Sequence, residues 1–306
     1  MSSTASILAP DRGMPVSRPG VTVTDLLLLL MAFIWGVNIA VVKYGTLHLS
    51  PLAYNGVRVT LAAVALLAIA AAMGKPWPGR REVLTLMLLG VLGNGLYQIL
   101  FIQGIAHTRA GNAALVLAAT PAFVALIGWM RGVERISRRG MIGIAISVVG
   151  IGLVVGGRAP IGAGASTLVG DLLVLGGCVC WAAFTVLVMP FTRRVDGVQV
   201  SGLTMAGGSI PLLLISAPAI VTTNWRSVEL PVWGAIVFSG LGALVIAYLC
   251  WYRGVRVLGP TRTSMYGNLQ PIVALIFAWA LLHEVPTLMQ GMGAASIITG
   301  LLLTRG

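Results

Sequence analysis

Long apolar runs separated by short polar gaps make up most of the chain. About 20 apolar residues span a bilayer as a helix, so these runs predict an all-α polytopic membrane protein with ten transmembrane helices. The predicted spans are 24–44, 51–73, 83–106, 110–130, 138–156, 169–190, 199–221, 231–252, 260–282 and 286–304. The polar residues before them, 1–22, predict a disordered tail.

The sequence also repeats itself at a spacing of 150 residues. A proline, a tryptophan and an acid recur in order, with Pro121, Trp129 and Glu134 returning as Pro271, Trp279 and Glu284. This match indicates an internal duplication, with repeats at 23–157 and 169–306 and a connecting loop at 158–168. Each repeat holds five spans, an odd number, so the second enters the membrane upside down. A 5+5 inverted-topology repeat is typical of secondary transporters, whose substrate site lies near the midplane.

Composition supports a membrane location. The chain is 58% hydrophobic and 9% charged, whereas soluble domains contain about 25% charged residues. The net charge of +12 would suit nucleic acid only if the basic residues formed one face of a folded domain. They lie instead in the gaps between apolar runs. We therefore expect the lipid bilayer as a partner, and no nucleic acid.

The distribution of basic residues predicts the orientation. If the N-terminus is cytoplasmic, fifteen of the 20 Lys and Arg residues face the cytoplasm, namely Arg12, Arg18, Lys75, Arg80, Arg81, Arg131, Arg135, Arg138, Arg139, Arg193, Arg194, Arg253, Arg256, Arg262 and Arg305. The opposite face holds Lys43, Arg109, Arg158 and Arg226. Cytoplasmic loops carry an excess of Lys and Arg. We therefore expect both termini in the cytoplasm and a bacterial inner-membrane location.

Polar and aromatic side chains share helix faces within the apolar spans. In the third span these are Asn94, Tyr97, Gln98 and Phe101, at positions i, i+3, i+4 and i+7. In the second repeat the corresponding candidates are Tyr248, Trp251, Tyr266 and Gln270. Polar groups within a membrane usually face the bundle interior or a water-filled cavity. They predict a substrate cavity, with hydrogen bonding between packed helices as the alternative.

Two tryptophans and two prolines occupy matched places in the repeats. Trp35 and Trp181 each lie about 16 Å into their helices, near mid-bilayer. We expect them either to face each other across a cavity or simply to pack in the core. Pro121 and Pro271 each remove a backbone donor and break the helix. Such a break serves a site or gate, unless a neighbouring Ser or Thr satisfies the freed carbonyl.

Few charged residues lie inside the spans. Arg58 sits about 10 Å into the second helix, where it could bind a substrate carboxylate or extend to the membrane surface. Asp25 and Asp171 each precede an apolar run and are interpreted as N-caps. Glu134, among several arginines, is interpreted as a surface ion pair. Proton-coupled carriers usually hold an acid or histidine at depth, so facilitated diffusion or exchange is expected.

The sequence lacks the residues that an enzyme or an ATP-driven pump would need. The three histidines are scattered near loop ends, and no metal-ligand spacing or phosphate-binding glycine loop occurs. We therefore expect no enzyme activity, no cofactor and no metal. A small-residue pair, Gly152 and Gly156, suits packing within the chain or a dimer face. A monomer or weak homodimer is expected.

The sequence resembles the EamA family of the drug/metabolite transporter superfamily over about residues 22–305. The resemblance rests on the recurring Pro–Trp–Glu pattern, on Trp35, Gly36 and Asn38 in the first span, and on Arg58 in the second. The second repeat departs from it, with Ala182 and Phe184 in place of the Gly and Asn, and Thr204 opposite Arg58. The resemblance implies metabolite transport, often export of amino acids or related compounds. The alternatives are a proton-coupled drug or metabolite exporter and a membrane scaffold that transports nothing.

Overall fold

The computed structural model describes residues 22–133, 137–156 and 164–304. The predicted tail before Thr22, Glu134 and most of the predicted 158–168 loop lie outside the described residues. Within them the chain is helical, without strands. The elements are α1 (Val23–His48), α2 (Pro51–Ala72), α3 (Arg80–Gly90), η1 (Val91–Leu96), α4 (Tyr97–His107), α5 (Ala110–Leu117), α6 (Thr120–Met130), α7 (Arg138–Gly156), α8 (Gly164–Thr192), α9 (Gly197–Thr222), η2 (Trp225–Ser227), α10 (Leu230–Val237), η3 (Phe238–Ile246), α11 (Ala247–Leu258), α12 (Pro260–Met265), η4 (Tyr266–Leu269), α13 (Gln270–Leu282) and α14 (Leu288–Thr304).

Eight helical runs of the described residues are long and apolar enough to cross a bilayer. They are Val23–His48, Pro51–Ala72, Arg80–His107, Ala110–Met130, Leu168–Thr192, Gly197–Thr222, Leu230–Leu258 and Pro260–Leu282. This number of spans makes the chain a multi-pass membrane protein. The other two predicted spans, 138–156 and 286–304, coincide with the helices α7 and α14. Two boundaries were wrong. Helix α8 begins at Gly164, inside the predicted loop, and α11 ends at Leu258, beyond the predicted end at 252. In both places residues outside the apolar run continue the helix.

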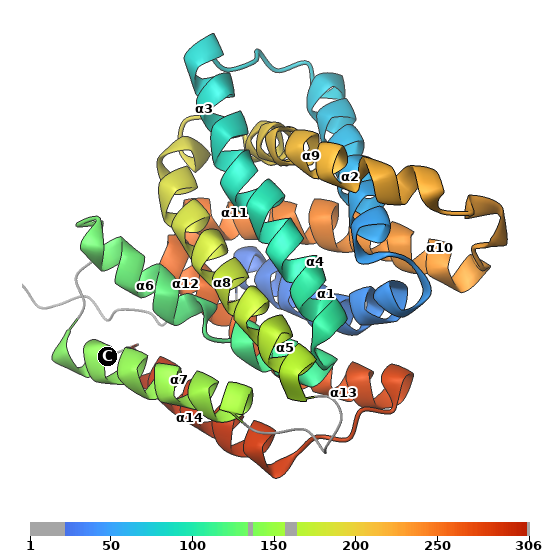
Figure 1. Cartoon of the computed structure of the whole chain (residues 1–306). Helices are drawn as coiled ribbons and strands as arrows, with labels where there is room; N and C mark the ends of the chain where they lie inside the picture. Colours follow the sequence, from blue (N-terminus) through green and yellow to red (C-terminus); the bar gives the residue numbers. More distant parts are fainter. Residues whose placement is uncertain (1–21, 134–136, 157–163, 305–306) are drawn as a thin grey trace, which may run out of the picture.

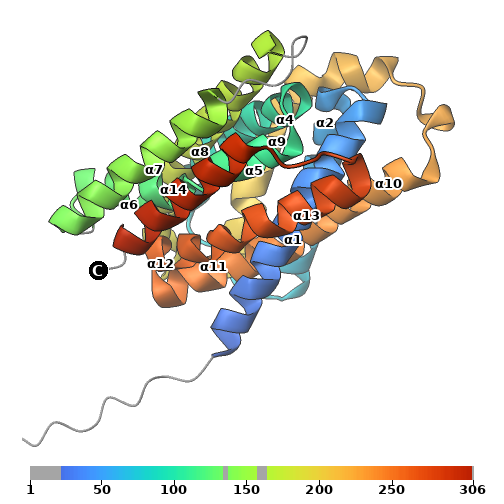
Figure 2. The same ribbon diagram turned by 90° about the horizontal axis from the view of Figure 1, so that it is seen from below.

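Helices α7 and α14 lie side by side (Figures 1 and 2). Their contact depends on glycines that recur at the same spacing of 150 residues, Gly143 with Gly293 and Gly150 with Gly300. A Cβ on Gly150 would lie 2.9 Å from the carbonyl oxygen of Gly293, and a Cβ on Gly300 would lie 2.3 Å from that of Gly143. Any side chain at Gly300 would therefore push the two backbones apart. The two contacts correspond to each other, because Gly150 and Gly143 occupy the same places in the first repeat as Gly300 and Gly293 in the second.

The other contacts between the halves also come in matched pairs. Helix α1 packs against α11 and α13, and its counterpart α8 packs against α4 and α6. Helix α2 packs against its own counterpart, α9. Figure 2 shows α1 running alongside α13 through the middle of the helix assembly. The first helix of each half therefore lies between the third and fourth helical runs of the other half.

The third helical run of each half contains a π-helical segment, η1 in the first half and η3 in the second. In η1, a Cβ on Gly93 would lie 2.2 Å from the ring of Phe184 on α8. Just before it, a Cβ on Gly90 would lie 1.9 Å from the carbonyl oxygen of Thr204 on α9. This close approach requires glycine at both positions. π-Helical turns often occur at functional sites, and each of these leads directly into the helix that carries candidate site residues.

Candidate functional site

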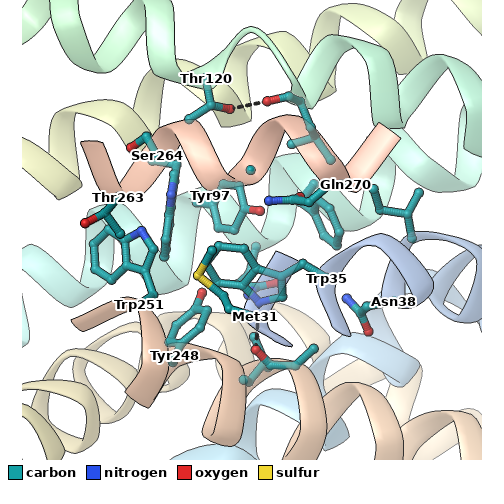
Figure 3. A pocket seen from close by; sticks show the side chains of 18 of the residues that line it. Met31, Trp35, Asn38, Tyr97, Thr120, Tyr248, Trp251, Thr263, Ser264 and Gln270 are labelled. Carbon is teal, nitrogen blue, oxygen red and sulfur yellow. Dashed lines mark hydrogen bonds between the residues drawn. The ribbon is translucent and has the colours of Figure 1, made fainter. Parts of the chain in front are cut away.

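A cavity lies where the two halves meet. It is lined by side chains from both halves, namely Met31, Trp35, Asn38, Ile39, Arg58, Tyr97, Gln98, Phe101, Leu117, Thr120, Pro121, Trp181, Ala243, Leu244, Tyr248, Trp251, Thr263, Ser264, Gly267 and Gln270. Figure 3 shows side chains from α1, α4, α11 and the α12–α13 region converging on this space. Its volume is about 70 Å³, enough for several waters, since one water needs roughly 10–15 Å³.

Most of the sequence-predicted site residues border this cavity. They are Trp35, Asn38, Arg58, Tyr97, Gln98, Phe101, Trp181, Tyr248, Trp251 and Gln270, together with Pro121. Three predicted residues do not border it: Asn94, Tyr266 and Pro271. The structure thus brings the first set together around one space. That these residues bind a substrate stays a prediction.

Trp35 and Trp181 form the centre of an aromatic wall. Their ring centroids are 6.0 Å apart, with the planes at 85°. Tyr248 packs against both rings, at 5.8 Å from Trp35 and 5.4 Å from Trp181. The indole Nε1 of Trp35 donates a hydrogen bond to the carbonyl oxygen of Ala243 at 2.9 Å. The two tryptophans therefore contact each other edge to face and do not stand apart across the cavity. They line it as a single wall built from both halves.

Arg58 lies in the protein interior, so it does not extend to the membrane surface. Its side chain is fully buried. Nε donates to Oδ1 of Asn55 at 2.9 Å, and Nη2 donates to Oε1 of Gln98 at 2.6 Å. The third nitrogen, Nη1, has no hydrogen-bond partner. The guanidinium lies against the aromatic rings of Tyr54 and Phe101.

Two other buried polar groups on the cavity wall lack partners. The side-chain oxygen of Asn38 accepts no hydrogen bond. The hydroxyl of Tyr248 lies beside Gln98 without forming a well-aligned hydrogen bond. Buried polar groups are nearly always hydrogen-bonded in folded proteins. Their occurrence together with the free Nη1 of Arg58, around one cavity, indicates a place where a polar ligand or water completes the bonding.

The two prolines stand where helices break, and Pro121 borders the cavity. Helix α5 ends at Leu117 and α6 begins at Thr120, with Pro121 in its first turn. The hydroxyl of Thr120 donates to the carbonyl oxygen of Leu117 at 2.6 Å, as Figure 3 shows. The freed carbonyl is thus satisfied by a neighbouring threonine. In the second half, the 3₁₀ segment η4 separates α12 from α13, and Pro271 lies in the first turn of α13.

Departures from α-helical geometry explain why two predicted residues do not reach the cavity. Asn94 lies within the π-helix η1, which has more residues per turn than the α-helix, so it leaves the face of Gln98. It packs against Gly208 on α9, and neither atom of its buried amide has a partner. Tyr266 lies in η4, and its hydroxyl donates to the carboxylate of Asp25.

Some lining and supporting residues were not predicted. Asn55 is fully buried, accepts a hydrogen bond from Arg58 and donates one to the backbone carbonyl oxygen of Gln98. The signal for it was present, because Asn55 lies three residues before Arg58 and therefore on the same helix face. Ser264 and Met31 also line the cavity. A methionine within an apolar helix gives no signal that separates it from core residues.

The two aspartates interpreted as N-caps have other roles. The N-cap of α1 is Thr22, and Asp25 completes the capping box as its N3 residue. Asp171 is the eighth residue of α8 and is fully buried. It accepts hydrogen bonds from the hydroxyl of Thr108 and from Nδ2 of Asn112. The interpretation of Asp171 was wrong because α8 begins earlier than its apolar run suggests.

Asp171 belongs to a polar network that joins the two halves at one end of the helices. The Oδ1 atom of Asn112 accepts a hydrogen bond from Nε2 of Gln290 at 2.7 Å. Nearby, the carboxylate of Glu284 accepts from the backbone N–H groups of Ala110 and Gly111, at 3.1 and 3.2 Å. A carboxylate is stabilised at a helix N-terminus by the helix dipole. Side chains from α14 and the α13–α14 connection thus hold the start of α5.

Comparison with known proteins identifies the family. The family model described as "EamA-like transporter family" matches twice, at residues 22–156 and 168–306. An uncharacterized transporter of Bacillus subtilis, YyaM, is 27% identical over 92% of this chain and 93% of its own length. A probable terminal-alkyne amino-acid exporter of Streptantibioticus cattleyicolor is 28% identical over 80% of this chain and 81% of its own. A probable amino-acid metabolite efflux pump of Salmonella typhimurium is 26% identical over 90% and 92%.

A solved crystal structure shares the fold. It superposes with a TM-score of 0.62 at 20% sequence identity, covering 92% of this chain and 96% of its own. The family model covers nearly all of the chain in two matches, and the structure supplies apolar helices with a cavity between the halves. The chain therefore belongs to the EamA-like transporter family.

Proposed function

We propose that the protein is a secondary carrier that exports amino acids or related small metabolites by alternating access, through facilitated diffusion or exchange. The observation that carries this proposal is the central cavity, which both halves of the chain line. A site shared between two halves can be exposed to either side of the membrane when one half moves against the other. A scaffold protein would not need such a cavity.

The proposed architecture is ten transmembrane helices in a 5+5 inverted repeat, with α7 and α14 as the fifth span of each half. Three features support it: the matched helix contacts, the paired π-helical segments and the double match to the family model. The excess of Lys and Arg in alternate loops supports cytoplasmic termini in a bacterial inner membrane. A reporter fused after Gly306 that was active only outside the cytoplasm would contradict this orientation.

The proposed substrate follows from the character of the cavity lining. It combines neutral polar groups, chiefly Asn38, Gln98 and Gln270, with an aromatic wall and the cation Arg58. These groups suit a zwitterion with an apolar side chain. Two relatives are described as a probable amino-acid exporter and a probable amino-acid metabolite efflux pump. Those descriptions support the substrate class and the direction of export.

The absence of an acid or histidine at the cavity supports uncoupled transport. Among the described residues that line it, none is Asp, Glu or His. Arg58 stays charged at any biological pH and cannot shuttle protons. A solute at high cytoplasmic concentration can leave down its own gradient through such a carrier. Proton coupling remains the alternative mechanism, and pH-driven accumulation would reveal it.

The test is counterflow in proteoliposomes. Vesicles containing the purified protein are loaded with a mixture of unlabelled amino acids and diluted into each labelled amino acid in turn. We expect transient accumulation of at least one label, and none in protein-free vesicles or with Gln98→Ala protein. An imposed pH gradient should not drive accumulation above equilibrium. Absence of counterflow for every amino acid and related metabolite tested would contradict the proposal.

A further inference from the structure

We propose that Arg58 is a carboxylate-binding subsite of the cavity, and that the carrier therefore exchanges substrates faster than it carries out net transport. The inference rests on the proposed function, since the cavity must be the transport site. Its starting point is the guanidinium group of Arg58. The side chain is fully buried, it lines the cavity, and Nη1 is its one nitrogen without a partner.

Two neighbours hold the guanidinium in place. Asn55 accepts from Nε at 2.9 Å and donates through Nδ2 to the backbone oxygen of Gln98 at 3.0 Å. Gln98 accepts from Nη2 through its side-chain oxygen at 2.6 Å. Both acceptors are neutral amides, so they fix the orientation of Arg58 without compensating its charge. Asn55 and Gln98 are positioning residues, and the nitrogen that they leave free is Nη1.

The charge of Arg58 has no counterion within the described residues. The ion pairs found there join Lys75 to Asp196 and Arg109 to Glu284. The aromatic rings of Tyr54 and Phe101 lie 6.0 and 5.7 Å from the guanidinium carbon and offer only a weak interaction with the cation. A buried charge is unfavourable unless it is paired and hydrogen-bonded. An anionic ligand supplies what is missing.

A carboxylate is the anion that fits this arrangement. Guanidinium groups form short, charge-assisted hydrogen bonds with carboxylates, and a single free nitrogen allows one such bond. The buried side-chain oxygen of Asn38, also on the cavity wall and unpartnered, can accept from the ammonium group of a zwitterion. The aromatic wall of Trp35 and Trp181 then faces the apolar part of the ligand.

Exchange follows from the charge of the empty carrier. When a carboxylate is bound, Arg58 is neutralised and the cavity reorients without an unpaired charge. When the site is empty, the same movement must occur with Arg58 uncompensated. A hydrogen bond to a charged group contributes about 1.5–3 kcal/mol, so exchange should exceed net efflux by about ten- to a hundredfold.

The binding test uses a carboxylate and its amide of the same shape. The thermal unfolding of the purified full-length protein is followed in isovalerate and in isovaleramide, at constant ionic strength. We expect isovalerate to raise the unfolding temperature of the wild type and isovaleramide to leave it unchanged. Arg58→Gln should abolish the difference. Equal stabilisation by both compounds, or undiminished stabilisation of the variant by isovalerate, would overturn the subsite.

A second variant keeps the guanidinium of Arg58, which Arg58→Gln removes together with its hydrogen bonds. Asn55→Asp keeps the size of the side chain and places a carboxylate against Nε of Arg58. It loses the bond from Nδ2 to the backbone oxygen of Gln98, so its folding is checked first by its thermal unfolding without ligand. The protein then supplies its own counterion, and isovalerate should no longer stabilise it. Undiminished stabilisation of Asn55→Asp by isovalerate would count equally against the subsite.

The transport test compares efflux of the amino acid that gives the strongest counterflow, into medium with and without the same amino acid. The efflux rate into medium that contains the amino acid should be about ten or more times the rate into medium without it. If counterflow occurs but the ratio is near one and amides compete as well as acids, the proposed function stands and the subsite is overturned. If no amino acid gives counterflow, the proposed function fails, and the isovalerate experiment still decides the subsite.

Discussion

Trp35 and Trp181 meet edge to face, with ring centroids 6.0 Å apart, although 145 residues separate them in the sequence. Each comes from the first helix of its half, and Tyr248 packs against both. Because the first helix of each half is inserted into the other half, this pair is the place where the halves touch beside the cavity. A change at either ring should therefore affect both packing and transport.

We predict that Trp181→Ala is strongly destabilising and abolishes transport. Trp181 is almost fully buried and contacts Trp35, Tyr97, Phe184 and two further rings. Truncating a buried tryptophan costs about 3–5 kcal/mol. Trp35→Phe should cost only about 1 kcal/mol, since it keeps a ring and loses the hydrogen bond to Ala243. Thermal unfolding in detergent and counterflow measure both, and equal effects of the two variants would contradict the prediction.

Glycines at the contact between α7 and α14 give a second prediction. Gly300→Ala should destabilise the protein by about 1–3 kcal/mol, the usual cost of overpacking, since the added Cβ meets backbone at 2.3 Å. Gly152 is the matched control, because a Cβ there meets nothing within 4 Å. Gly152→Ala should be neutral or stabilising by about 0.5–1 kcal/mol. If Gly300→Ala were as stable as Gly152→Ala, the close packing of these helices would be wrong.

The sequence was sufficient to predict the helical runs and many of the residues around the cavity. Apolar length alone placed most helix ends to within four residues, with larger errors at the start of α8 and the end of α11. Matched positions in the two repeats singled out Trp35, Trp181 and Tyr248. The breaks at Pro121 and Pro271 followed from the missing backbone donor. These features depend on apolar length, on repeated residues and on proline's missing N–H, all of which can be read directly from the sequence.

Other features depend on contacts that no local pattern reveals. The π-helix η1 arises where Gly90 and Gly93 allow α9 and α8 to approach the backbone, and it turns Asn94 away from the cavity. The partners of Arg58 come from two different helices. Asp171 was misplaced for a simpler reason: the small polar residues before it extend α8, so it lies in the third turn and not at the cap.

The network around Asp171 gives a third prediction, with a rescue. Asp171→Asn leaves one side-chain oxygen for two donors, the hydroxyl of Thr108 and Nδ2 of Asn112, so one of these hydrogen bonds is lost or reversed. The oxygen of Asn112 cannot compensate, because it is already bonded to Gln290. Asn112→Asp puts two carboxylates against each other. Each single change should lower the free energy of unfolding by about 1–3 kcal/mol. The exchange Asp171→Asn with Asn112→Asp restores a donor facing an acceptor, and should recover most of the loss in thermal unfolding. Additive losses in the double variant would show that the two side chains do not interact.

The last prediction concerns pH. Asp196, between α8 and α9, caps α9 by accepting from the N–H of Val198 at 2.9 Å, and it pairs with Lys75 at 2.6 Å. Partial burial raises the pKa of the Asp196 carboxyl, but the bonds from Lys75 and Val198 and the charges of Lys75 and Arg256 outweigh it. The net effect is a pKa below the usual value.

A lowered pKa in the folded protein means that the ionised carboxylate stabilises the fold. That contribution is complete above the unfolded pKa of about 3.9 and is lost as the pH falls through the folded pKa. Asp196→Asn keeps a good N-cap but loses the ion pair, so at pH 7 it should cost no more than about 1 kcal/mol. Unfolding temperatures of the two proteins should therefore differ at pH 7 and converge as the pH falls below 3.9. A difference that grew in acid would mean that the carboxylate is destabilising in the folded protein, and the assigned pairing with Lys75 would be wrong.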